Sequence, residues 1–328
     1  MNAVIEKPTL DLAAPVAAAL DQVMNTFDEE LCGDLPFVEK LVDQVRQFRG
    51  KLLRPKLLLL TAKAVGDIRR EHIVLAAVVE MVHMATLVHD DVLDESDVRR
   101  RRPTINRLVG NEGAVLLGDY LISHAYHLCT SLGSVEYARR IADVTNTVCE
   151  GELMQIEHRG DTDLSEARYL EIIRRKTAAL TGVCCELGAA AAGADRRIVQ
   201  SMAAFGVDLG MAFQIVDDLL DLTGTENELG KTAGRDADLG KWTLPAIRFR
   251  DRADAADRRR LVDALSNGSP DKSESIRSIL AGSDAMDYAM GMARSYVQSA
   301  LRQLAELPMT DAKKSLIAAA EFIVNRRA

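Results

Sequence analysis

The sequence predicts an all-α protein folded as one large helical bundle. Hydrophobic residues make up 48% of the 328 residues and aromatic residues only 4%, so Leu, Ala, Val and Ile must fill the core, and such a composition favours helices over strands. Almost every segment repeats its apolar residues with helical period, and no alternating strand pattern of useful length appears. No Pro- or Ser-rich linker divides the chain. We therefore expect a single domain over residues 1–328.

Five long segments are expected to be helices, with short breakers of Gly, Pro, Asn or Asp between them. They span residues 73–94, 114–132, 139–158, 165–192 and 197–222. Residues 73–88 and 202–216 are apolar nearly all round, which is typical of helices at the centre of a large bundle. Residues 266–275 are polar and are expected to form a surface loop.

Charge and cysteine content exclude several classes of protein. The net charge of −8 argues against a general nucleic-acid binder, although local Arg and Lys clusters could still bind a small anion. Five cysteines without metal-ligand spacing indicate neither a disulfide framework nor a zinc site. The N-terminus lacks a signal-peptide pattern, and no uncharged apolar run reaches the roughly 18 residues of a membrane span. We expect a soluble, cytoplasmic protein without a transmembrane segment.

Two acidic clusters with the same spacing carry the main chemical signal. Asp90 and Asp94 are four residues apart, as are Asp217 and Asp221, so each pair shares one helical face. Both clusters end apolar helices, where carboxylates that point into a bundle are costly without cations. Magnesium takes oxygen ligands and is commonly shared between carboxylates and substrate phosphates. The pattern therefore predicts a site for a magnesium–diphosphate complex.

Basic residues that could meet a diphosphate stand near both clusters. An Arg run, residues 99–102, follows the first cluster, and the planar fork of a guanidinium suits phosphate oxygens. Further candidates are Lys51, Arg54, Lys176, Lys231 and Lys241. His83 lies seven residues before Asp90 and so falls on the same helical face, which favours a substrate contact.

In these motifs the chain resembles the trans-isoprenyl diphosphate synthase family, in particular bacterial long-chain octaprenyl diphosphate synthases. The resemblance runs from GKLLRP near residue 50 through HMATLVHDDVLD, RRKTAAL and FQIVDDLLD to GKWTLP near residue 240. It implies a helical bundle around a central cavity and a magnesium-dependent prenyltransferase that acts as a homodimer. It also implies the joining of isopentenyl diphosphate to an allylic diphosphate, such as farnesyl or geranyl diphosphate.

The resemblance also implies a role for each matched residue. Asp90, Asp91 and Asp94 would hold magnesium on the allylic diphosphate, opposite Asp217, Asp218 and Asp221. Arg99 would contact the allylic diphosphate, and isopentenyl diphosphate would be bound by Lys51, Arg54, His83 and Arg100. The allylic pocket would be lined by Lys176, Thr177, Gln214 and Lys241, with Phe213 beside it and Lys231 as a further substrate-binding residue. Arg101, Arg102 and Trp242 differ from the residues that the family usually has at these positions. These differences bear on the affinity for substrates and leave the expected reaction class unchanged.

The expected product is long, most specifically octaprenyl diphosphate for quinone side chains. In the family, bulky residues at the fifth and fourth positions before the first acidic motif block the tunnel that receives the growing chain. Here these chain-length positions hold Ala85 and Thr86, both small. The alternatives are a farnesyl or geranylgeranyl diphosphate synthase, a terpene cyclase and a non-catalytic partner subunit. The Lys51, Arg54 and His83 set argues against a cyclase, and the two intact acidic clusters argue against a non-catalytic subunit.

Overall fold

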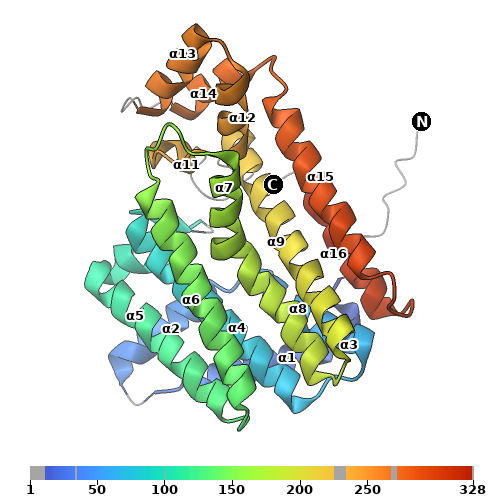
Figure 1. Cartoon of the computed structure of the whole chain (residues 1–328). Helices are drawn as coiled ribbons and strands as arrows, with labels where there is room; N and C mark the ends of the chain where they lie inside the picture. The colour runs from blue at the N-terminus through green and yellow to red at the C-terminus, as the bar shows by residue number, and fades with distance from the viewer. Residues whose placement is uncertain (1–11, 34, 100, 225–233, 267–271, 327–328) are drawn as a thin grey trace, which may run out of the picture.

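Helices account for almost all of the described chain (Figure 1). The structure is a computed structural model, and it describes residues 12–33, 35–99, 101–224, 234–266 and 272–326. The helices of the first half are η1 (Ala14–Val16), α1 (Ala17–Glu30), α2 (Pro36–Gln47), α3 (Leu53–Val65), α4 (Arg70–Leu93), α5 (Ile105–Thr130) and α6 (Val135–Glu157). Those of the second half are α7 (Glu166–Ile173), η2 (Arg174–Ala178), α8 (Ala179–Ala191), α9 (Arg196–Thr223), α11 (Arg235–Asp238), α12 (Leu244–Arg252), α13 (Ala255–Ser266), α14 (Lys272–Leu280), α15 (Ala285–Gln303) and α16 (Asp311–Asn325). Two strands of two residues each, β1 (Val98–Arg99) and β2 (Arg102–Pro103), pair antiparallel after α4.

The all-α prediction is confirmed, with three local differences. The expected helix 165–192 is three elements, α7, η2 and α8, because a π-helical turn interrupts it at Arg174–Ala178. The expected break at Gly110 is a kink inside α5, where this glycine has φ 79°. The loop expected at 266–275 is wrong for Ser266, which ends α13, and for residues 272–275, which begin α14, while residues 267–271 lie outside the described chain.

Local polar residues start several of these helices. Ser134, Ser165 and Asp195 each precede a helix and accept a hydrogen bond from the backbone N–H three residues later. Such N-caps satisfy donors that have no partner within the helix. The starts of α6, α7 and α9 are therefore encoded locally.

The helix α4 is the centre of the core. Residues 72–82 of this helix are all buried, and α4 packs along α5 and also contacts α1, α3 and α8. By length and composition alone, α4 and α9 could each cross a membrane, but the most apolar window of α4 is 78% buried inside the bundle. The apolar character of α4 thus reflects its central position, as the sequence predicted. Its C-terminal end carries the first acidic cluster.

Two glycines illustrate how closely some helices approach. A Cβ atom at Gly206 of α9 would lie 2.4 Å from the carbonyl oxygen of Thr181 on α8. By contrast, a Cβ atom at Gly291 of α15 would meet no atom within 4 Å. The contact of α8 with α9 therefore requires a residue without a side chain, whereas Gly291 is dispensable for packing.

We expect Gly206→Ala to lower the free energy of unfolding by about 1–3 kcal/mol, because the two backbones must move apart. Gly291→Ala is the matched control and should be neutral or raise it by about 0.5–1 kcal/mol, since alanine is the better helix former. Urea denaturation of both variants measures the difference. Equal effects of the two substitutions would contradict the close packing of α8 on α9.

Candidate active site

The first acidic cluster lies at the C-terminal end of α4, where the negative end of the helix dipole meets Asp90, Asp91 and Asp94. Burial raises the pKa of Asp90 to about 6, with Lys176 opposing the rise and the carboxylates of Glu152 and Asp94 adding to it. A carboxylate in such a position is stabilised by a cation placed beside it.

Asp91 is held by Arg99, which lies on β1. Asp91 is only 3% exposed, and Arg99 Nε lies 2.9 Å from its Oδ1 and 3.0 Å from its Oδ2, with Nη2 2.8 Å from Oδ1. Arg99, predicted to contact the allylic diphosphate, thus donates to a cluster carboxylate in this structure. The pair compensates a buried charge that would be costly if left alone.

Asp94 is paired with cations from two distant segments. Lys241 Nζ lies 3.1 Å from its Oδ2, and Arg159 Nη2 lies 3.4 Å from its Oδ1. Lys241 was predicted to line the allylic pocket, and the structure places it directly against the first cluster. Arg159, which follows α6, was not predicted.

The second cluster lies near the C-terminal end of α9, and its central residue, Asp218, is buried. Tyr169 Oη donates to Asp218 Oδ2 at 2.7 Å, and Gln214 Nε2 donates to Asp218 Oδ1 at 2.7 Å. Burial raises the pKa of Asp218 to about 8, and the nearby carboxylate of Asp236 adds to the rise, while the two hydrogen bonds oppose it. Asp221 is also buried, and its Oδ2 accepts from the backbone N–H of Asp236 at 3.1 Å.

Lys176, in the π-helical turn η2, places a positive charge beside the first cluster. Its Nζ lies 2.5 Å from Glu152 Oε2 and 2.8 Å from Gln155 Oε1, both on α6. Burial alone would lower the pKa of Lys176, but the carboxylates of Asp90 and Glu152 outweigh it and raise the pKa. The ammonium therefore stays charged beside the first cluster. Single π-helical turns are frequent at functional sites.

A hydrogen-bonded chain leads from η2 to the second cluster. Thr177 Oγ1 donates to Gln214 Oε1 at 2.8 Å, and Gln214 in turn donates to Asp218. Gln214 and Thr177 were both predicted in the allylic pocket, and the structure brings them into contact. The chain fixes the orientation of the Gln214 amide.

A small cavity of about 80 Å³ collects many of these residues. Of the predicted residues it is lined by Lys176, Thr177, Gln214, Asp218 and Lys241. Lining residues that the sequence reasoning missed include Gln155, His158, Tyr169, Asp236 and Trp242. Segments far apart in the chain thus meet at one point, between the two acidic clusters.

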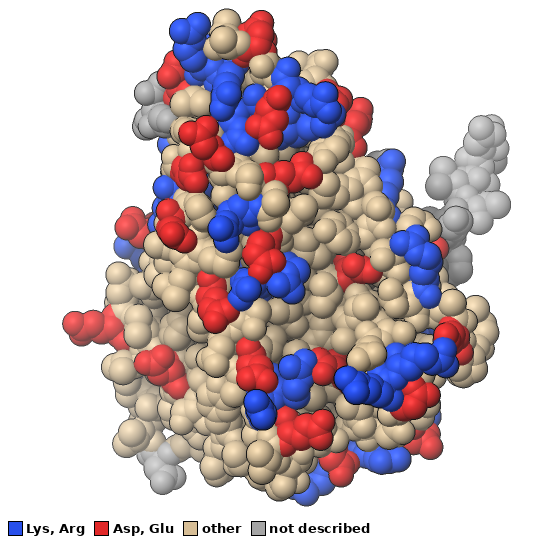
Figure 2. Space-filling view, viewed as in Figure 1, with Lys and Arg blue, Asp and Glu red and all other residues tan. Residues whose placement is uncertain are grey.

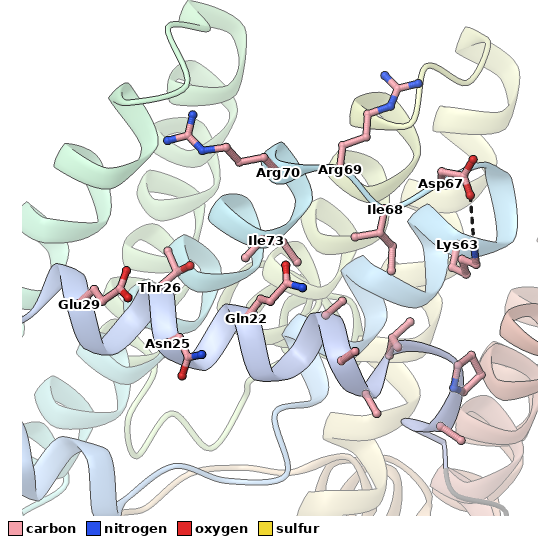
Figure 3. Close-up of a pocket in the computed structure, with 16 residues that line it drawn as sticks. Gln22, Asn25, Thr26, Glu29, Lys63, Asp67, Ile68, Arg69, Arg70 and Ile73 are labelled. Carbon is pink, nitrogen blue, oxygen red and sulfur yellow. Dashed lines mark hydrogen bonds and ion pairs between the residues drawn. The ribbon is translucent and has the colours of Figure 1, made fainter.

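A larger groove of about 880 Å³ lies at the opposite end of α4, between α1 and the α3–α4 turn (Figure 3). It contains none of the predicted site residues. Its labelled walls carry Gln22, Asn25, Thr26 and Glu29 on one side and Arg69 and Arg70 on the other. This groove is therefore separate from the candidate active site.

The residues predicted for isopentenyl diphosphate lie on α3 and α4. Lys51 is exposed just before α3, and His83 is partly buried on α4. Arg54 is on α3; burial lowers its pKa, and among the described residues its Nε has no hydrogen-bond partner. A buried N–H donor of this kind suits an anionic ligand. Arg100 and Lys231 lie outside the described residues.

Two further predicted positions have clear surroundings. Ala85 is fully buried, whereas Thr86 is partly buried and its Oγ1 donates to the carbonyl of His83 at 2.7 Å. Phe213, predicted beside the allylic pocket, lies under the guanidinium of Arg326, 4.3 Å from Arg326 Cζ to the ring centre. Arg326 also lies 3.5 Å from Asp217 Oδ1.

The donor set fits a hard divalent cation that is shared with a ligand. In the described part of the chain, no three His, Cys, Asp or Glu side chains are grouped so as to hold a metal ion by themselves. The raised pKa values of Asp90 and Asp218 show carboxylates that lack sufficient positive charge around them. Magnesium usually completes its octahedral shell with water and substrate phosphate oxygens, so a partly assembled carboxylate set is what such a site requires.

Several residues of the site were not predicted from the sequence, and they differ in whether a sequence pattern could have indicated them. Glu152 and Gln155 are three residues apart in GELMQ, a polar pair on one face of a predicted helix that could have been recognised. Tyr169 falls in the same expected helix, 165–192, as the predicted Lys176 but gave no separate signal. Arg159 and Arg326 had none, because only the tertiary fold brings them to the acidic clusters.

The raised pKa of Asp218 makes stability depend on pH. In the unfolded chain the Asp218 carboxyl has its ordinary pKa of 3.8, whereas in the folded protein its pKa is about 8. In EDTA, the contribution of this carboxyl to the stability of the wild type should therefore fall as the pH rises between these two values. Asp218→Asn removes this loss. The free energy of unfolding of the variant, relative to the wild type, should therefore increase from pH 4 to pH 8 in urea denaturation. A difference that stays constant over this range would contradict the raised pKa.

Comparison with known proteins identifies the family of this chain. A sequence model of the polyprenyl synthetase family matches residues 36–282. The chain is 35% identical over 310 residues to the octaprenyl diphosphate synthase of Haemophilus influenzae, with 94% of both chains covered. It is 33% identical to the geranylgeranyl diphosphate synthase of Sulfolobus acidocaldarius, covering 94% of this chain and 96% of that one. The crystal structure of polyprenyl synthase from Caulobacter crescentus, complexed with calcium and isoprenyl diphosphate, superposes with a TM-score of 0.92 at 33% identity and 97% coverage of both chains. The fold and the similarity along nearly the whole chain lead to the same result: the chain belongs to the polyprenyl synthetase family and is a trans-polyprenyl diphosphate synthase, a prenyltransferase.

Proposed function

We propose that this prenyltransferase condenses isopentenyl diphosphate head to tail onto an allylic diphosphate, with magnesium, and makes a long-chain product, most specifically octaprenyl diphosphate for quinone side chains. The observation that carries the proposal is one small cavity lined by Asp218 of the second cluster together with Lys176 and Lys241, whose ammonium groups lie beside carboxylates of the first cluster. Carboxylates and ammonium groups in one place suit a metal–diphosphate complex, because the carboxylates bind the metal and the cations bind phosphate oxygens.

The acidic clusters are the proposed metal ligands. Asp90, Asp91 and Asp94 would hold magnesium from α4, and Asp217, Asp218 and Asp221 from α9. When bound there, magnesium would stabilise the allylic diphosphate as a leaving group. The calcium and isoprenyl diphosphate in the Caulobacter crescentus relative support divalent metal use.

The chain's own residues would bind and orient the substrates. Lys176 and Lys241 are the proposed cations for the allylic diphosphate, together with Arg99, which also holds Asp91. The Thr177 hydroxyl and the Gln214 amide, ordered by their mutual hydrogen bond, provide dipoles beside the developing allylic cation. The apolar lining must exclude water, which would otherwise quench that cation.

Isopentenyl diphosphate is proposed to bind beside α3 and α4. Arg54 supports this assignment, because its buried Nε needs an acceptor. Lys51, His83 and Arg100 complete the proposed set. The proton released on condensation would be taken up by the departing diphosphate, which leaves no need for a protein nucleophile.

The product-length proposal depends on the small chain-length positions. Ala85 is buried and Thr86 is partly buried on α4, so neither adds a bulky side chain below the first cluster. Each added C5 unit gains several kcal/mol when buried, at about 0.8 kcal/mol per CH₂ group. The names of the relatives do not indicate a product length. An octaprenyl diphosphate synthase is 35% identical to this chain, and a geranylgeranyl diphosphate synthase is 33% identical. Met81, Tyr126 and Met154 are candidates for a tunnel floor.

A cytoplasmic homodimer is the proposed assembly. Large apolar side chains are exposed on two neighbouring helices, with Val115 and Leu116 on α5 and Leu153 and Ile156 on α6. Figure 2 shows few charged side chains on the side of the molecule where α5 lies. Exposed apolar surfaces of this kind are normally covered by a partner, and a second copy of the chain fits the homodimer that the family resemblance implies.

Metal removal tests the proposed cofactor. Activity should be lost in EDTA and return with magnesium, and Asp90→Ala should lower kcat by at least about a hundredfold by removing a ligand that acts on the leaving group. The variant should remain folded, because the substitution also relieves carboxylate repulsion. Turnover with labelled isopentenyl diphosphate measures both effects, and full activity in EDTA would refute the metal role.

Product analysis tests the chain length. Incubation with labelled isopentenyl diphosphate and farnesyl diphosphate should give products in the hexaprenyl-to-decaprenyl range, with octaprenyl dominant. Ala85→Phe should shorten the product to farnesyl or geranylgeranyl length while the first condensation continues, because the ring would fill the tunnel. A wild-type enzyme that stops at C15 or C20 would show that another helix supplies the floor.

Sedimentation tests the assembly. The wild type should sediment as a dimer at micromolar concentration, and Leu116→Asp should shift it towards the monomer by placing a charge in the apolar face. Leu35→Asp is the control, since Leu35 is similarly exposed, at 65% against 68%, but lies outside α5 and α6. A monomeric wild type would contradict the proposal.

A further inference from the structure

A short segment, residues 234–241, touches both acidic clusters, and we call it the bridging segment. On the side of α9, the backbone N–H of Gly234 donates to the carbonyl of Asp221 at 3.0 Å, and that of Asp236 donates to Asp221 Oδ2 at 3.1 Å. Gly234 has φ 73°, a left-handed conformation that favours glycine. The start of the segment is therefore attached to the last residue of the second cluster.

The same segment reaches the first cluster through two side chains. Lys241 Nζ pairs with Asp94 Oδ2 at 3.1 Å. Arg235 Nη2 donates to two backbone carbonyls at the end of α4, that of Asp94 and, at 3.1 Å, that of Glu95. The eight residues of the bridging segment thus connect the end of α4 with the end of α9.

The two side chains differ in what they occupy. Lys241 takes up a carboxylate oxygen of Asp94, so a metal ion at that oxygen must compete with it. Arg235 binds the main chain, so its hydrogen bonds to the carbonyls of Asp94 and Glu95 leave the carboxylate oxygens of the cluster available to a metal ion. The Arg235 contacts are therefore compatible with both the metal-free and the metal-bound site.

The position of Arg235 also suits the charge at the end of α4. The last carbonyls of a helix lack intrahelical donors and carry the negative end of the dipole. Here that end also bears Asp90, Asp91 and Asp94, and Glu95 follows in a left-handed conformation with φ 49°. A guanidinium at these carbonyls stabilises the helix end and the turn after it.

We propose that Arg235 is a positioning residue that fixes the separation of the two acidic clusters by capping the C-terminal end of α4. With Arg235 in place, carboxylates from α4 and α9 are held at a spacing that one metal–diphosphate unit can bridge. The inference rests on the proposed metal–diphosphate site and adds to it a residue that touches neither metal nor substrate.

Binding of magnesium and inorganic diphosphate, followed by the fluorescence of Trp242, tests the proposal without turnover. Trp242 is the sole tryptophan in the sequence, is 3% exposed and lines the site cavity next to Lys241. Arg235→Ala should raise the magnesium–diphosphate concentration for half-saturation by about tenfold, the scale on which residues that support metal ligands act. Arg235→Lys should recover part of this loss, because an ammonium can donate to the carbonyls but lacks the planar fork.

Arg197→Ala is the matched control. Arg197 is also an arginine with an ion pair, to Glu306, but it lies exposed at the start of α9, away from the clusters. The magnesium–diphosphate concentration for half-saturation of Arg197→Ala should stay within twofold of that of the wild type. Thermal melting of all variants separates the positioning role from a general loss of fold, and Arg235→Gln replaces Arg235→Ala if the latter does not fold.

The outcomes are distinct. Normal half-saturation in Arg235→Ala, or an equal shift in Arg197→Ala, would overturn the role of Arg235 while leaving the proposed site intact. A wild type that shows no magnesium-dependent binding of diphosphate, by fluorescence and by calorimetry, would overturn the proposed site and this inference together.

Discussion

Repulsion between carboxylates is the constraint on which the rest of this structure depends. Three aspartates end α4 and three lie near the end of α9, and burial pushes the pKa of Asp90 to about 6 and that of Asp218 to about 8. Charges so placed are tolerated only with compensating donors. Apart from Gln214 of α9, the compensating groups named above come from segments outside α4 and α9, among them β1, η2, α7 and the bridging segment.

The packing of small residues makes this compensation geometrically possible. A Cβ atom at Gly151 on α6 would lie 2.5 Å from the backbone nitrogen of Lys176, so the bare backbone lets α6 and η2 approach closely. Lys176 is thereby held within reach of Glu152 and close to Asp90. The close packing of α6 against η2 thus determines the position of the Lys176 ammonium.

The cations around the clusters fall into two groups with different consequences. Lys241 and Arg99 bind carboxylate oxygens, so they hold the clusters together in the absence of a metal and compete with one when it arrives. Arg235 binds main-chain carbonyls and leaves those oxygens alone. In the proposed metal site, the carboxylate oxygens would change partners on metal binding, whereas the contacts of Arg235 would stay in place.

Sequence alone determined the fold class and the positions of both acidic clusters, because helical periodicity and the spacing of aspartates depend on nearby residues. The resemblance of its motifs to a known family indicated the reaction class. The same reasoning located Lys176, Thr177, Gln214 and Lys241, which the fold brings to one cavity. It missed the π-helical turn at η2, since i to i+5 bonding leaves no simple pattern in composition. Only the tertiary structure decided that Arg99 holds Asp91, that Tyr169 holds Asp218, and that Arg159 and Arg235 reach the end of α4. These pairings depend on atoms that come within about 3–4 Å of one another from segments up to 141 residues apart, and no local pattern encodes such a meeting.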